Sequence, residues 1–176
     1  MGLERRTMRP MDTPQGTRAA HYAAEFEAAQ RDLIRVIESL SDEQWRLVGR
    51  NFPQRLNDED EHRSVGVIAH HVAVNTPWIL DRIERMLDGR PLPPADFGAL
   101  NARHASEHAD VSRDEVLALL RGQQAEVAEA VRIIPDDQLD VARDTPVGPM
   151  SIAQRLDRVL VGHIRMHLGS IEAAIG

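Results

Sequence analysis

Two histidines near the end of the chain have a type and spacing suited to metal chemistry. His163 and His167 stand four residues apart, so on a helix they project from one face with their Cβ atoms about 5–6 Å apart. Such a pair can bind one ion through two imidazoles. The residues expected on the same stripe are all apolar: Ile152, Leu156, Val159, Leu160 and Ile171. We therefore expect both rings to point into the protein, where a shared metal would satisfy nitrogens that burial takes from water. Core histidines bonded to carboxylates or water are the alternative.

A third ligand is expected from the adjacent residues His70 and His71. Their helical phases differ by about 100°, so at most one of them can point squarely at a given interior site. The phase favours His71 but leaves His70 open. Three imidazoles from two helices leave a coordination position for water or substrate, which is typical of a catalytic or ligand-binding site. Imidazole ligands suit zinc, nickel, iron or copper.

The remaining histidines have more polar surroundings. His104 and His108 are also four apart, but their helical face is polar, and we interpret them as solvent-exposed. They could still line the mouth of a cleft or bind adventitious metal. We assign no role to His21 and His62.

The elements that must position these residues are helices. Apolar residues recur at three- and four-residue steps, and Ser-led caps and Gly-Pro boundaries delimit the segments. Pro77, inside one segment, predicts a kink near residues 73–77. Helices are expected over residues 17–40, 64–87, 112–133 and 151–176, with shorter pieces at 41–48 and 95–108.

Four long helices predict an all-α four-helix bundle. Residues 17–176 are expected to form one domain preceded by a flexible arm, residues 1–16. The acidic run within residues 49–63 is interpreted as a solvated loop, and residues 141–150 could hold a short extended piece.

Composition excludes several classes of function. The net charge of -7 and an aromatic content of 3% argue against a nucleic-acid-binding surface. The chain has no cysteine, and all of its 21 Lys and Arg residues are arginine, which excludes thiolate sites and lysine-based chemistry. The chain has no apolar run long enough to predict a membrane-spanning helix. We expect a soluble cytoplasmic protein.

The sequence resembles the DinB/YfiT-like superfamily of metal-binding four-helix bundles. Three segments carry the resemblance over roughly residues 18–175: LSDEQW at 40–45, RSVGVIAHHVA at 63–73 and HIRMHL at 163–168. The family's first ligand falls on His71, and the other two fall on His163 and His167. Arg63 stands where the family usually has tryptophan.

The resemblance implies more than the residues show by themselves. It implies a long crossover between the second and third helices, short extra helices, and often a homodimer. It also implies a divalent transition metal, zinc first and nickel or iron next, with a small-molecule substrate. Some relatives are thiol-dependent transferases or isomerases, so we expect a transferase, isomerase or hydrolase that uses a metal-activated low-molecular-weight thiol or water. A non-catalytic binding or stress-response protein with a structural or vestigial metal site is the alternative.

Overall fold

The computed structural model describes residues 17–50 and 62–176 of the 176-residue chain. The arm predicted at residues 1–16 and the acidic run Asp58–Glu61 lie outside the described residues. The helices are α1 (Thr17–Ser39), α2 (Asp42–Arg46), α3 (Val65–Leu87), α4 (Phe97–Glu107), α5 (Arg113–Arg132), α6 (Ile152–Arg155) and α7 (Gly162–Ile175). A 3₁₀ turn, η1 (Asp136–Gln138), follows α5, and a π-helical segment, η2 (Leu156–Val161), joins α6 to α7.

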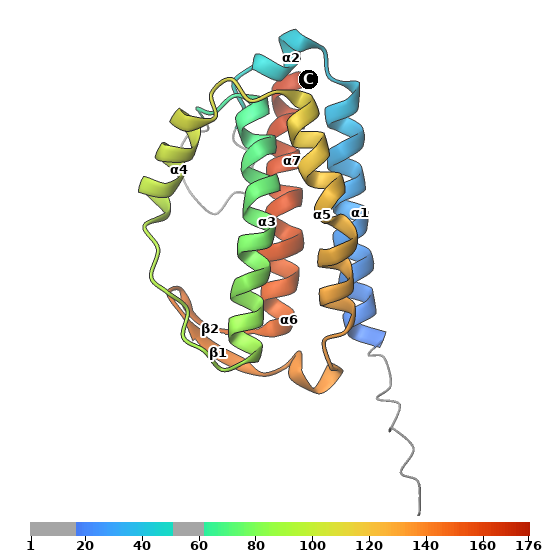
Figure 1. The fold of residues 1–176 in the computed structure, drawn as a ribbon, viewed down its shortest axis with the longest axis vertical. Helices are drawn as coiled ribbons and strands as arrows, with labels where there is room; N and C mark the ends of the chain where they lie inside the picture. Colours follow the sequence, from blue (N-terminus) through green and yellow to red (C-terminus); the bar gives the residue numbers. More distant parts are fainter. Residues whose placement is uncertain (1–16, 51–61) are drawn as a thin grey trace, which may run out of the picture.

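Four long helical segments form the bundle predicted from the sequence (Figure 1). They are α1, α3, α5 and the continuous rod made of α6, η2 and α7. Figure 1 shows α3 and α5 running in the same direction, because the chain returns along the outside of the bundle between them. This crossover spans residues 88–112 and contains α4. The expected long crossover between the second and third long helices is therefore confirmed.

Serine side chains begin most of the helices, as the sequence predicts. Ser41 and Ser151 each form a reciprocal capping box with the residue three positions later. Ser64 and Ser112 accept hydrogen bonds from the backbone N–H groups of Val67 and Glu115. These caps satisfy N–H groups that have no partner within the helix, which is why the helix starts could be read locally.

The connection before the last rod contains a β-hairpin. Strands β1 (Ala142–Thr145) and β2 (Gly148–Ser151) pair antiparallel, with Ala142 opposite Ser151. The short extended piece expected within residues 141–150 is thus present. It closes the end of the bundle where α3 finishes and α6 begins (Figure 1).

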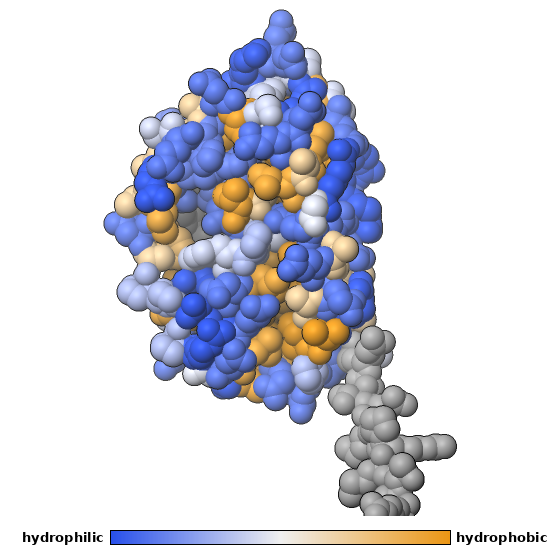
Figure 2. Space-filling model, in the orientation of Figure 1, coloured by the Kyte–Doolittle hydropathy of each residue, from blue (hydrophilic) through white to orange (hydrophobic). Residues whose placement is uncertain are grey.

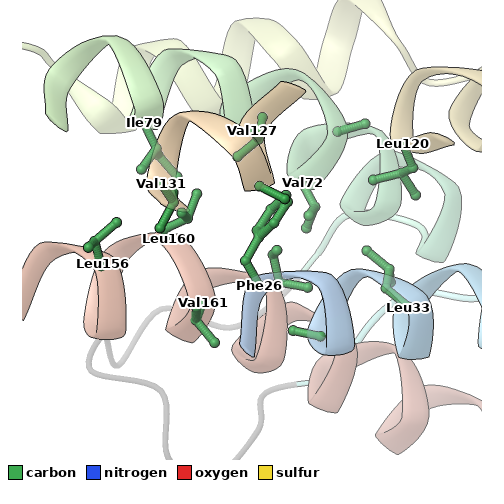
Figure 3. Close-up of a cluster of buried hydrophobic side chains, with 14 of the residues drawn as sticks. Phe26, Leu33, Val72, Ile79, Leu120, Val127, Val131, Leu156, Leu160 and Val161 are labelled. Carbon is green, nitrogen blue, oxygen red and sulfur yellow. The ribbon is translucent and has the colours of Figure 1, made fainter. Parts of the chain in front are cut away.

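The core lies along the axis between the four long segments. Phe26 points from α1 into the space between α3 and α5, near Val72 and Val127 (Figure 3). The side chains of Phe26, Leu33, Leu120 and Leu160 are each at most 1% exposed. No helix within the described ranges is long and apolar enough to cross a membrane.

Helix α3 runs unbroken through Pro77. Proline has no N–H to donate to the carbonyl of Ala73 four residues earlier. The side chain of Gln123, on α5, donates to that carbonyl at 3.1 Å instead. The neighbouring helix thus replaces the hydrogen bond that the proline removes.

Candidate metal centre

Three histidines from α3 and α7 converge on one point. His71 comes from the first half of α3, and His163 and His167 lie one turn apart on α7. A ligand nitrogen from each ring lies within 4.8 Å of the others. The Nε2 atoms of His71 and His163 are 3.2 Å apart. His71 and His167 are buried, with 6% and 2% exposure, and His163 is half-buried. We name these residues the first histidine cluster.

The spacing within the first histidine cluster fits a metal ion. Imidazole nitrogens bound to zinc at about 2.0–2.1 Å in a tetrahedral arrangement lie about 3.3 Å apart, close to the distance between His71 and His163. The Nδ1 atom of His163 is buried and has no hydrogen-bond partner among the described residues. Burial, with a smaller contribution from the positive charge of Arg63, lowers the pKa of His163 to about 4. The ring is therefore neutral at pH 7, the form that coordinates metal.

Asn75 holds the His71 side chain from one turn further along α3. Its amide nitrogen donates to the backbone carbonyl of His71 at 2.8 Å and lies 2.9 Å from the ring atom Nδ1. Partners of this kind fix the orientation of a ligand ring. The Nε2 atom of His71 meanwhile lies beside His163.

A π-helical turn sets the position of His163. In η2 the N–H of Gly162 bonds to the carbonyl of Asp157, five residues back. The extra residue shifts the helical register, so Ile164 faces the core and is buried. His163 lies on the flank of the core. His167 is buried, as expected, and half-buried His163 turns its ring towards His71, although the expectation for this pair assumed an unbroken α-helix.

The first histidine cluster lines a cavity of about 310 Å³. Its other walls combine apolar and cationic side chains, with Trp78 and Ile79 from α3, Phe97 from α4, and Val159 and Met166 from the last rod. Arg63 and Arg158 also line it. Arg165 is not among the residues that line this cavity, and it pairs with Glu25 at the surface.

A second group of histidines gathers next to the first. His70, His104 and His108 each offer a ligand nitrogen within 4.8 Å of the others. His70 is buried, whereas His104 and His108 are half-buried. The prediction that His104 and His108 are solvent-exposed is wrong, because the crossover folds α4 against the face of α3 that carries His70. His21 and His62 are exposed, and neither belongs to either group.

A comparison with known protein families places most of the chain in one family. The family model of the DinB superfamily matches residues 25–171, which include the first histidine cluster and the helices that carry it. The chain belongs to the DinB superfamily. The resemblance drawn from its three sequence segments is thereby confirmed.

Two solved structures show that this DinB superfamily protein has a fold known elsewhere. YfiT from Bacillus subtilis, described as a probable metal-dependent hydrolase with an unusual four-helix bundle topology, superposes with a TM-score of 0.69. The two are 18% identical, over 95% of this chain and 91% of YfiT. An uncharacterised protein from Escherichia coli UTI89 gives a TM-score of 0.66 at 14% identity, over 94% of this chain and 95% of the other. These identities establish the fold alone. No curated protein sequence matches the chain.

Several features of the site escaped the sequence analysis. Arg158 lines the cavity. It lies five residues before His163 in the chain, and no local sequence signal distinguishes it from a surface arginine. Phe97 and Asn101 of α4 also line the cavity. Their placement depends on the path of the crossover, which local sequence does not specify.

Proposed function

We propose that this DinB superfamily protein is a metal-dependent enzyme that binds one divalent transition-metal ion through His71, His163 and His167. Zinc is the first candidate, and nickel and iron follow. The convergence of three imidazole nitrogens at the wall of a cavity carries this proposal. Three protein ligands leave a coordination position open, as in catalytic zinc sites.

The bound ion would act as a Lewis acid that lowers the pKa of a coordinated water or thiol. The side chains that line the cavity would bind and orient the substrate. Arg63 and Arg158 place positive charge at the cavity, so a substrate with a carboxylate or phosphate group would be attracted and oriented. Trp78 and Phe97, whose rings meet edge to face with centroids 5.9 Å apart, would hold an apolar part of the substrate and exclude water. We therefore propose a small substrate with one anionic end and one apolar end.

Hydrolysis and thiol transfer are the two reactions that this arrangement supports. The similarity to YfiT, described as a probable metal-dependent hydrolase, favours water as the nucleophile. The resemblance to thiol-dependent relatives favours a low-molecular-weight thiol as co-substrate. The two are separated by assaying small anionic esters, amides and electrophiles with and without added thiol, because only transfer requires the thiol.

Metal analysis tests the proposed site directly. The protein is purified without affinity metal, and its zinc, nickel and iron contents are measured for the wild type and for His71→Ala, His163→Ala and His167→Ala. We expect each substitution to remove the ion of the first histidine cluster, because two imidazoles bind a divalent ion much more weakly than three. His21→Ala, at an exposed histidine, is the matched control and should keep the wild-type content.

Either of two results would contradict the proposal. Unchanged metal content in any one of the three variants would remove that residue from the site. Stoichiometric metal without any reaction of water or thiol, together with an ion that exogenous ligands cannot reach, would favour a non-catalytic protein in which the metal is structural.

We further propose that the protein is a homodimer. The proposal comes from the resemblance to the superfamily. Sedimentation equilibrium would test it, and a mass of 19.7 kDa at all concentrations would contradict it.

A further inference from the structure

The second histidine cluster consists of His70, His104 and His108. His70 lies on α3, His104 lies in the last turn of α4, and His108 caps the end of α4. The ring of His70 is centred 5.0 Å from that of His104 and 4.1 Å from that of His108, and the rings of His104 and His108 are 4.9 Å apart. Two elements that are separate in the chain thus bring three imidazoles into mutual contact.

We propose that the second histidine cluster is a second metal site, for a divalent ion such as zinc, which fastens α4 against α3. Each of its residues offers a ligand nitrogen within 4.8 Å of the others, as in the first histidine cluster. The donor set is purely imidazole, which suits zinc, nickel and copper rather than magnesium or calcium. Nothing in the DinB match or in the similar folds assigns a role to these residues.

Burial supports metal binding over a chance gathering of histidines. His70 is only 2% exposed, and its Nδ1 atom lies 2.8 Å from Nε2 of His104, a hydrogen-bond distance. That bond uses one nitrogen of each ring. The other ring nitrogen of His104, Nδ1, is buried without a hydrogen-bond partner among the residues that the structure describes. Buried polar atoms without partners cost stability. In the hydrogen bond one of the two bonded nitrogens carries the hydrogen, whereas coordination of an ion would use the lone pairs of both.

The distance between His70 and His104 also predicts a movement. At 2.8 Å the two nitrogens are closer than the roughly 3.3 Å expected for two ligands of one tetrahedral zinc ion. Binding must therefore replace the hydrogen bond and separate the rings by about half an ångström. Helix α4 can accommodate this shift, because none of its side chains is buried.

The second histidine cluster occupies a position from which it can influence the first. The ring of His104 is centred 5.5 Å from that of His71, so the two clusters touch. Two α4 residues, Phe97 and Asn101, line the cavity that contains the first cluster. An ion on His70, His104 and His108 would hold that wall in place, and this consequence rests on the function proposed for the first cluster.

A second cavity reaches these residues. It has a volume of about 490 Å³, and residues of α3, α4 and α5 line it, among them the second histidine cluster, Glu107 and Glu115. On the face of the molecule that Figure 2 shows, hydrophobic side chains lie among hydrophilic ones. Glu107 is paired with Arg103, which lines the same cavity, so Glu115 is the carboxylate whose charge favours the entry of a cation.

Zinc titration of the metal-free protein tests the proposal. Metal is removed with a chelator, and zinc binding is followed by competition with a chromophoric chelator. We expect two equivalents for the wild type and for His21→Ala, and one equivalent for His104→Ala and His108→Ala. Both test substitutions lie on or at the end of α4, where no side chain of the helix is buried, so the bundle should remain folded.

Hydrogen exchange of residues 97–107 provides the second readout. Zinc should slow exchange across α4 in the wild type but not in His108→Ala. Zinc binding by both α4 variants that equals that of the wild type would overturn the proposal. Exchange in α4 that does not respond to zinc would also overturn it, because a cluster held only by hydrogen bonds gives that result.

The same titration separates this proposal from the proposed function. His163→Ala should lose the equivalent that belongs to the first cluster and keep the one that fastens α4. If His163→Ala binds as much zinc as the wild type while His104→Ala and His108→Ala each bind one equivalent less, the first site fails and the second stands.

Discussion

At the scale of single residues, two adjacent histidines belong to different clusters, because successive residues of an α-helix point in directions about 100° apart. His70 and His71 are neighbours in the chain, yet His71 meets His163 and His167, while His70 meets His104 and His108. The sequence indicated correctly that both could not serve one interior site. It could not predict the second histidine cluster, because His104 and His108 lie in the crossover, whose path the local sequence does not specify.

Burial of neutral histidines predicts that the metal-free protein is less stable in acid. The pKa of His163 is lowered from 6.5 to about 4, mainly by burial, and that of His104 is lowered to about 4 by burial and by the nearby His70 and His108. Between these pH values the unfolded chain binds more protons than the folded one, so stability falls as the pH falls from about 6.5 towards 4. A full shift of this size corresponds to about 3 kcal/mol per residue, and partial exposure of the rings reduces it.

Urea unfolding in the presence of a chelator at several pH values would measure this loss. His163→Gln, which keeps a polar side chain but does not titrate, should flatten the pH dependence. An equally steep dependence in His163→Gln would show that other groups cause the acid sensitivity.

At the scale of elements, local signals gave the helix starts and failed where the backbone departs from regular α-helix. Ser41, Ser64, Ser112 and Ser151 act as caps within their own segments, so sequence alone located them. The π-helical segment η2 has no such signature. Its residues Leu156, Leu160 and Val161 are buried in the core, and the segment alters which residues face the cavity.

The π turn predicts a specific cost for a methyl group at Gly162. A Cβ atom there would lie 3.0 Å from the carbonyl oxygen of Asp157, which is backbone and cannot move aside easily. We expect Gly162→Ala to lower the free energy of unfolding by about 1–3 kcal/mol, as overpacking does, and to weaken metal binding by displacing His163. Gly122→Ala is the control, because its Cβ would meet nothing within 4 Å on an exposed face of α5. It should stabilise the protein by up to about 1 kcal/mol. Equal effects of the two substitutions on zinc affinity would contradict this account.

The contact between α3 and α5 at Pro77 predicts a coupled pair of substitutions. Gln123→Ala removes the donor to the carbonyl of Ala73 and should cost about 1–2 kcal/mol. In a Pro77→Ala background the new backbone N–H can donate to the same carbonyl, so the cost of Gln123→Ala should fall below about 0.5 kcal/mol. Urea unfolding of the four proteins gives the coupling energy. Additive costs would show that the Gln123 bond does not replace the one lost at Pro77.

At the scale of the whole molecule, each cluster joins elements that are distant in the chain. His71 and His163 are separated by 92 positions, and His70 and His104 by 34. The sequence predicted the bundle because amphipathic helices of this length have few ways to bury their apolar faces. It could not place α4, whose side chains are not buried and whose position depends on contacts such as that of Trp78 with Phe97.

This long-range joining predicts how zinc changes the stability of the whole bundle. An ion that binds the folded protein and not the unfolded chain stabilises it by about 1.4 kcal/mol for each tenfold rise in free zinc above the dissociation constant, per site. Unfolding separates the ligands of both clusters, so the wild type should show a slope approaching twice that value where both sites are filled. His163→Ala and His108→Ala should each show a slope of one site, and the variant carrying both substitutions should show none. Urea unfolding in zinc buffers measures these slopes, with His21→Ala as the control. A single-site slope in the wild type that disappears in His163→Ala would leave the first cluster as the metal site and the second as a hydrogen-bonded contact between α3 and α4.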